Sequence, residues 1–418
     1  MKLNTKKFIR NIIICLIAFI IVSLILNYAP GFKRDKYKNV TKLIINDEDF
    51  TEKLAKNVFI DEDNNIYLSK EDMKNFFDKN IYYSKENNMI ITTSNTKVAS
   101  MLVNNDKATI NGVEQTLKAK ALEKDETIYI PLSELSLVYN INTKYIADTN
   151  KVVVERLNTG LIKATVAEES VIKFKPRRLS KNVGELKKDE EVSCYYTTSK
   201  GWRLIRTEDG TLGYVKANTL TNQYIVRQDL NDEIKTAEIT TSLKDGSTLS
   251  LYNKEATAKI KIRTLFNISS NGAIESTEED LNSENYKIWA TISNKGLEKQ
   301  TNELIMDYSK RTELINTIVS YASKYRVAGI NIDFESVNNN EAFNRFIIEL
   351  TPRLRELGIT TNVILNNSFD EAGIVGIVDY LITEKGEITN EENQNYSNSS
   401  VNNSFGNIIR LQINVYKS

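Results

Sequence analysis

The sequence contains no histidine, and its 418 residues include only 2 cysteines and 4 prolines. Without histidine the chain cannot build a Ser-His-Asp or Cys-His catalytic site, a histidine-ligated zinc or copper centre, or a histidine general base. Acid–base chemistry near neutral pH must therefore use carboxylates, tyrosines or lysines. Cys15 and Cys194 are too few for a thiolate metal site, and Cys15 lies inside an apolar run. We therefore expect no disulfide, no metal and no cofactor.

The chain also lacks an excess of charge of either sign, since 55 basic residues balance 55 acidic ones. A net charge of zero gives no reason to expect nucleic acid as a partner. At about 150 residues per domain, the length indicates two or three domains, each large enough to bury a core.

A long apolar run, Ile12–Leu26, lies near the N-terminus. It follows a basic flank of Lys2, Lys6, Lys7 and Arg10. Extended to Tyr28, the run would be about 26 Å long as a helix, the short end of a membrane span. A cleaved signal peptide is the alternative, but the sequence before Pro30 lacks an Ala-x-Ala-like cleavage site. We therefore expect residues 1–32 to be a cytoplasmic flank and an uncleaved transmembrane anchor in the cell membrane, with the remainder extracellular.

Residues 44–157 contain an internal repeat, because the pattern that begins at Ile66 recurs at Ile128. Each copy predicts a strand, a short helix, an extended segment, a polar turn and a closing strand, the last being Met89–Thr93 or Lys151–Glu155. This pattern resembles the repeat domain called copper amine oxidase N-terminal-like, which is common in surface proteins of Gram-positive bacteria. The resemblance implies no oxidase chemistry, and we expect a non-catalytic module that faces the cell wall or acts as a spacer.

Residues 161–221 change to short strands separated by turn residues, with a spacing that suits a small all-β barrel. The segment from Gly201 to Val215 resembles the bacterial Src-homology-3-like domain, a family that binds cell-wall peptide or packs against a neighbouring hydrolase. Trp202 and Tyr214 could stack on a ligand, but in a barrel this small we expect them in the core. Cys194 is interpreted as a buried small hydrophobic residue.

Strands alternate with helices in residues 240–385. The expected strands are Thr248–Tyr252, Ile260–Phe266, Lys287–Ile292, Val327–Asp333, Thr360–Leu365 and Val378–Ile382. Ser309 could cap a helix that continues to Tyr325, and a second helix is expected over Glu341–Leu357. This alternation predicts a parallel sheet covered by helices.

The last residues, 386–418, do not follow this alternation. Glu387–Asn407 is rich in Asn, Ser and Glu, and we expect it to be a low-complexity, disordered tail. Ile408–Tyr416 could be a strand.

The segment Ala328–Glu335 carries the candidate chemistry. Strand alternation places Asn331, Asp333 and Glu335 on one side, at the end where barrel enzymes hold their catalytic residues. Two carboxylates at this spacing influence each other's pKa, so one can stay ionised while the other keeps its proton and serves as a general acid. The alternative is a solvated loop at the end of a strand.

This segment resembles the glycoside hydrolase family 18 signature, Asp-Gly-x-Asp-x-Asp-x-Glu, on a (β/α) barrel strand. The neighbouring strand and helices resemble the branch that contains cortex-lytic and other peptidoglycan N-acetylglucosaminidases. By this resemblance Glu335 is the general acid, and Asp333 orients the N-acetyl group of the substrate, whose oxygen attacks the anomeric carbon. Asn331 occupies the middle Asp position, Ala328 replaces the first Asp, and Trp289 on the neighbouring strand would contact substrate.

The sequence also departs from this family. The sixth strand of the family ends in a Met-x-Tyr-Asp element, whereas here Val378–Ile382 is followed by Thr-Glu-Lys-Gly. The seventh and eighth strands have no counterpart, so we expect an incomplete barrel.

These expectations combine into one prediction. The fold class is multidomain, with a transmembrane helix, an α+β repeat domain, a small all-β SH3-like barrel and a partial α/β TIM-type barrel. The expected partners are the membrane and a cell-wall glycan, either peptidoglycan or a chitin-like oligosaccharide. The expected function is cleavage of β-1,4-linked N-acetylglucosamine polymers. The alternative, favoured by the missing Tyr-Asp pair, is an inactive family member that binds wall glycan.

Overall fold

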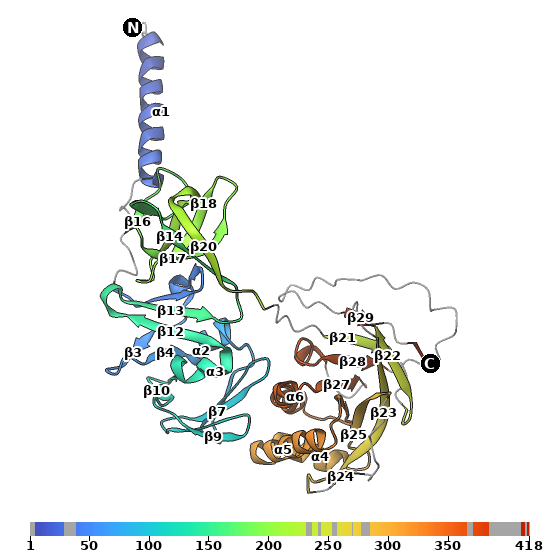
Figure 1. Cartoon of the computed structure of the whole chain (residues 1–418). Helices are drawn as coiled ribbons and strands as arrows, with labels where there is room; N and C mark the ends of the chain where they lie inside the picture. The colour runs from blue at the N-terminus through green and yellow to red at the C-terminus, as the bar shows by residue number, and fades with distance from the viewer. Residues whose placement is uncertain are drawn as a thin grey trace. The chain divides into compact units, whose positions relative to one another are not determined.

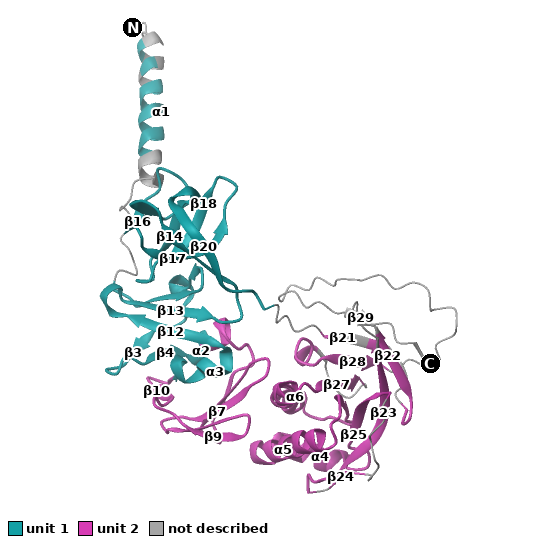
Figure 2. Ribbon diagram, in the orientation of Figure 1, with its two compact units in different colours: residues 1–72, 129–231 teal, residues 73–128, 232–418 magenta. Residues whose placement is uncertain are grey.

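The structure is a computed structural model that describes residues 5–28, 39–230, 236–240, 244–252, 257–269, 271–276, 285–365, 371–383, 411–413 and 416–417. The chain forms two compact units, the first made of residues 1–72 and 129–231 and the second of residues 73–128 and 232–418 (Figure 2). Each unit therefore combines two segments that are separate in the sequence. The predicted disordered segment Glu387–Asn407 lies outside the described residues.

The predicted fold class is wrong. In the described part of the chain no helix combines the length and apolar character needed to cross a membrane, so the transmembrane anchor predicted in residues 1–32 is not supported. The N-terminal helix is α1 (Thr5–Tyr28). Instead of the predicted α+β repeat domain, small all-β barrel and partial α/β barrel, the described elements after α1 are mostly strands, which form five sheets (Figure 1).

The repeat region contributes two small sheets to the first unit. In one sheet the order is β12 (Ile141–Ile146), β13 (Lys151–Arg156), β1 (Lys42–Ile45) and β2 (Glu48–Asp49), with β1 and β13 parallel. In the other, β4 (Ile66–Ser69) lies between β3 (Phe59–Ile60) and β11 (Thr127–Pro131). The accompanying helices are short: α2 (Lys70–Phe76) and α3 (Ser136–Tyr139).

The two copies of the repeat share a turn geometry. Asn88 and Asn150 both have a positive φ, at 47° and 50°, a region that asparagine tolerates better than most residues. The side-chain oxygen of each asparagine accepts a hydrogen bond from a tyrosine hydroxyl, Tyr83 at 2.7 Å in the first copy and Tyr145 at 3.2 Å in the second. Sequence repetition therefore corresponds to repeated local structure.

Residues 161–227 form an antiparallel sheet in the first unit. Its strand order is β16 (Asn182–Leu186), β15 (Ser170–Lys173), β19 (Leu212–Lys216), β18 (Trp202–Arg206), β17 (Glu191–Thr197), β14 (Leu161–Val166) and β20 (Leu220–Arg227). Cys194 and Trp202 are buried, as predicted. Tyr214 is half-buried, and its hydroxyl is hydrogen-bonded to that of the exposed Tyr196.

The second unit begins with an antiparallel meander. Its strands are β5 (Tyr82–Ser84), β6 (Met89–Thr93), β7 (Val98–Leu102), β8 (Lys107–Ile110) and β9 (Val113–Thr116), followed by the short β10 (Leu122–Lys124). Strands β6 and β7 lie next to α6 (Asn340–Glu356), a helix of the C-terminal segment of the same unit. The meander and this segment therefore form one compact body.

The C-terminal segment forms one mixed sheet. Its order is β29 (Leu411–Ile413), β21 (Ala237–Thr240), β28 (Tyr380–Thr383), β27 (Thr360–Leu365), β26 (Gly329–Asp333), β25 (Lys287–Ser293), β23 (Thr257–Ile268), β22 (Thr248–Tyr252) and β30 (Tyr416–Lys417), with β24 (Ile274–Ser276) also paired to β23. Strands β21, β28, β27, β26, β25 and β23 are parallel. Strands β22, β23 and β24 are antiparallel because the links between them are too short for a helical crossover. The segment from β25 to β27 therefore follows the predicted alternation of parallel strands and helices, whereas β22 and β24 depart from the pattern of a TIM-type barrel.

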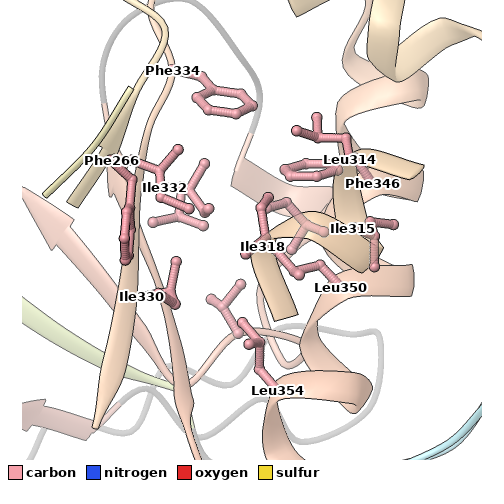
Figure 3. Close-up of a cluster of buried hydrophobic side chains, with 14 of the residues drawn as sticks. Phe266, Leu314, Ile315, Ile318, Ile330, Ile332, Phe334, Phe346, Leu350 and Leu354 are labelled. Atoms are coloured by element: carbon pink, nitrogen blue, oxygen red, sulfur yellow. The ribbon is translucent and has the colours of Figure 1, made fainter. Parts of the chain in front are cut away.

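Three helices lie on one side of this sheet: α4 (Glu298–Met306), α5 (Tyr308–Lys324) and α6 (Asn340–Glu356) (Figure 1). Ile330 and Ile332 of β26 point toward these helices, where they meet Ile318 and Leu350 (Figure 3). These four side chains are completely buried, and each such burial stabilises the fold by about 1.5–3 kcal/mol. Because the helices cover this face of β26, only the opposite face of the strand is left for a functional site.

Candidate functional site

The opposite face of β26 carries a buried row of polar side chains. Asn331 donates a hydrogen bond from Nδ2 to Oγ1 of Thr291 on β25 (3.2 Å), and its Oδ1 accepts one from Nδ2 of Asn362 on β27 (2.8 Å). The three residues are paired in register across the parallel strands. Oδ1 of Asn362 is buried and has no hydrogen-bond partner among the described residues. Asn331 is thus held between its two neighbours by its own amide group.

Asp333 lies two residues beyond Asn331 on the same face, at the carboxyl end of β26. It is half-buried and in register with Ser293 of β25. Glu335 follows the strand end, and its side chain is exposed. The structure therefore brings Asn331, Asp333 and Glu335 to one end of one strand, with burial decreasing along the row. A carboxylate at this exposed end can meet a ligand without displacing the core.

Two buried asparagines hold the backbone around Glu335, and the sequence analysis did not identify them. Asn294, directly after β25, accepts a hydrogen bond from the Glu335 N–H (2.7 Å) and donates one to the Glu335 carbonyl (3.0 Å). Asn302, on α4, donates to the Ser336 carbonyl (2.9 Å) and accepts from the Asn338 N–H (3.0 Å). The sequence offered only one signal for such a role, namely that Asn294 directly follows an apolar strand. This signal is weak, because the sequence does not show that Asn294 contacts Glu335.

Trp289 lies elsewhere. It is in register with Gly329 at the start of β26, four residues before Asp333, which is about 13 Å along a strand. Its ring is 2% exposed and packs against Tyr380, with ring centroids 5.1 Å apart. The structure therefore does not bring Trp289 together with Asp333 and Glu335, and the ring belongs to a second apolar cluster on the side of the sheet away from the helices.

Asp379, directly before β28, and Tyr380, its first residue, are also at the amino end of the parallel strands. Asp379 accepts hydrogen bonds from Nε of Arg355 (3.0 Å) and from the Thr361 N–H (2.8 Å). Burial, followed by the charge of Asp379, raises the pKa of Tyr380. These two side chains stabilise the start of β28 and are not at the strand end where Thr383 lies.

No group of three or more Asp, Glu or Cys side chains among the described residues is arranged to hold a metal ion.

Comparisons with known proteins agree with part of the sequence analysis. Residues 44–154 match the family described as copper amine oxidase N-terminal domain, which confirms the resemblance of the first module. No curated protein sequence matches the chain. The bacterial SH3-like resemblance of residues 161–221 stays a prediction.

Several solved structures are similar to part of the chain. A Bacillus subtilis protein described as a sporulation-specific glycosylase is 23% identical with a TM-score of 0.30, over 33% of this chain and 53% of that chain. The spore cortex-lytic enzyme SleL of Bacillus cereus is 18% identical with a TM-score of 0.28, over 42% and 45%. A chitinase from Chromobacterium violaceum is 19% identical with a TM-score of 0.28, over 36% and 55%. The chain thus spans about half the length of these structures, and TM-scores of this size do not establish a common fold.

Proposed function

We propose that the C-terminal segment of the second unit binds and cleaves β-1,4-linked polymers of N-acetylglucosamine, with peptidoglycan favoured over chitin because of the repeat and SH3-like modules that precede it. One observation carries the proposal. Half-buried Asp333 closes the polar face of β26, and exposed Glu335 follows it on a backbone that Asn294 holds by two hydrogen bonds. A solvated loop would not need a fixed backbone beneath an exposed carboxyl group.

The proposed mechanism assigns a separate role to each carboxyl group. Glu335 gives its proton to the glycosidic oxygen as the bond from that oxygen to the anomeric carbon breaks. The acetamide oxygen of the substrate forms the new bond to that carbon, and the ionised Asp333 accepts a hydrogen bond from the acetamide N–H and stabilises its developing positive charge. Water then attacks the anomeric carbon, the bond from that carbon to the acetamide oxygen breaks, and the proton that the water loses goes to Glu335, which restores the acetamide and the enzyme.

A second candidate function is glycan binding without turnover. The specific observation in its favour is the position of Asp379, whose carboxylate is held by Arg355 and Thr361 at the start of β28. The described part of β28 therefore supplies no acidic side chain at its carboxyl end. Such a side chain would stabilise the positively charged ring, an oxazolinium ion, that forms when the acetamide oxygen bonds to the anomeric carbon. Action outside the cell, on the wall, is part of both proposals.

The two candidates are separated by measuring binding and cleavage on the same preparation. The purified full chain is mixed with purified peptidoglycan and, separately, with N-acetylglucosamine oligomers. Release of reducing ends supports the hydrolase, and co-sedimentation with peptidoglycan without release supports the binding protein. Neither binding nor release at physiological salt would contradict both.

A further inference from the structure

Glu335 lies just beyond the part of β26 that the sheet supports. The pairing of β25 with β26 ends at Ser293 and Asp333, and the pairing of β26 with β27 ends at Ile332 and Val363. A residue two positions past a strand end ordinarily loses the hydrogen bonds that order a strand backbone. The position of the Glu335 backbone must therefore come from other contacts.

Asn294 supplies these contacts from a buried position. Its side chain is only 2% exposed, and its amide makes two opposed hydrogen bonds with the N–H and the carbonyl of the same residue, Glu335. A side-chain amide that donates and accepts in this way replaces the pair of backbone hydrogen bonds that a neighbouring strand would make. The two bonds restrict both displacement and rotation of the peptide units that flank the Glu335 side chain.

The residues on both sides of Glu335 are fixed independently. Phe334 is buried and stacks on Phe346 of α6, with ring centroids 5.6 Å apart (Figure 3). Ser336 has a positive φ of 54°, a conformation that costs a serine free energy and persists only when neighbouring contacts impose it. Asn302 provides one such contact through its hydrogen bond to the Ser336 carbonyl. The exposed carboxyl group of Glu335 thus projects from a backbone that is held on three consecutive residues.

We propose that Asn294 is a positioning residue that orients Glu335 for proton transfer, an inference that rests on the proposed hydrolase function. A general acid must lie within hydrogen-bond reach of the glycosidic oxygen, and a displacement of about 1 Å can cost about 10²-fold in rate. Asn294 does not touch the substrate in this account. It acts through the backbone of Glu335.

The test uses the full chain and three variants: Asn294→Ala, which removes both hydrogen bonds, Asn294→Asp, which keeps the acceptor for the Glu335 N–H, and Asn302→Ala. We expect Asn294→Ala to lower kcat for N-acetylglucosamine oligomers by about 10- to 10²-fold with KM nearly unchanged. A misplaced general acid stabilises the transition state less, whereas the affinity for the substrate hardly changes. Asn294→Asp should recover part of this loss. Asn302→Ala, a buried asparagine bound to the same loop, is the matched control and should lower kcat less.

Amide hydrogen exchange provides a readout that does not depend on activity. Asn294→Ala should accelerate exchange at the Glu335 amide, and Asn302→Ala should accelerate it at the Asn338 amide. Cleavage that depends on Glu335 but is unchanged in Asn294→Ala, or lowered equally by Asn302→Ala, overturns the positioning role alone. Absence of any Glu335-dependent cleavage overturns the proposed hydrolase function and the positioning role together, even if the exchange pattern is as expected.

Discussion

Arg311 of α5 and Glu349 of α6 form a buried ion pair with two hydrogen bonds, each 3.1 Å long. The hydroxyl of Tyr82, on β5 of the meander, donates to Glu349 (2.7 Å) and accepts from Arg311 (2.8 Å). Burial, followed by the charge of Glu349, raises the pKa of Tyr82 above its usual value, so the phenol stays protonated and can donate. The three side chains connect the two sequence segments of the second unit.

The first prediction concerns this ion pair. Glu349→Gln leaves the Arg311 guanidinium buried without a counter-charge, so it should lower the free energy of unfolding of the second unit by about 3–5 kcal/mol. Glu341→Gln is the control, because the side chain of Glu341 is exposed and pairs with Arg345 on the surface of the same helix, where the loss should be under about 1 kcal/mol. Urea unfolding followed by Trp289 fluorescence, in a Trp202→Phe background, measures both. Equal effects of the two substitutions would contradict the structure.

The second prediction concerns alkaline stability of the first unit. Burial raises the pKa of Tyr195 to about 12, and its hydroxyl donates to the Asn46 carbonyl at 2.9 Å. An unfolded tyrosine ionises near pH 10, so the stabilisation is fully present below pH 10 and is lost as the pH rises from 10 toward 12. The expected contribution of Tyr195 is about 2 kcal/mol, so Tyr195→Phe should reduce the alkaline loss by about that amount. Tyr67 and Tyr214 of the same unit, whose pKa values burial also raises to about 12, account for a remaining loss. Denaturant unfolding at pH 8 and pH 11.5 measures it, with Tyr196→Phe as the control for removal of an exposed phenol.

The third prediction concerns the contact between Gly329 and Trp289. A Cβ atom added at Gly329 would lie 2.6 Å from the Trp289 ring and 2.5 Å from Oγ1 of Thr360. Gly329→Ala should therefore destabilise the second unit by about 1–3 kcal/mol through overpacking. Adding Trp289→Phe should recover part of this loss, because the smaller ring leaves room for the methyl group. Thermal unfolding of the single and double variants decides it, and additive losses would show that the two residues do not share this space.

Much of the local structure could be predicted from the sequence. Strands β22 and β27 begin and end at the predicted residues, because apolar β-branched runs bounded by turn residues are strong local signals. The cap of helix α5 lies two residues before the predicted one, because Asp307 caps the helix instead of Ser309 and accepts a hydrogen bond from the Lys310 N–H. Such shifts arise because two residues close together in the sequence can both have a side chain that caps a helix.

Other features could not be predicted because they depend on distant partners. Helix α4 was missed, since its nine residues carry few apolar side chains and are stabilised by packing. The contact between Asn294 and Glu335 joins residues 41 positions apart, and local periodicity contains no trace of it. Trp289 was expected to contact substrate, but Gly329 on the next strand leaves space for its ring in the core. The transmembrane anchor was inferred from a local apolar run, its basic flank and the lack of a cleavage site, and the structure does not support it.

The most direct test of the proposed function is the activity of Glu335→Gln in the full chain. Glutamine keeps the shape of the side chain but has no proton to give, so reducing-end release from N-acetylglucosamine oligomers should fall by about 10²- to 10⁴-fold while glycan binding is retained. Glu341→Gln, the same substitution at an exposed position of α6, should leave turnover unchanged. Turnover by the wild-type chain that Glu335→Gln does not reduce would contradict the assignment of the site.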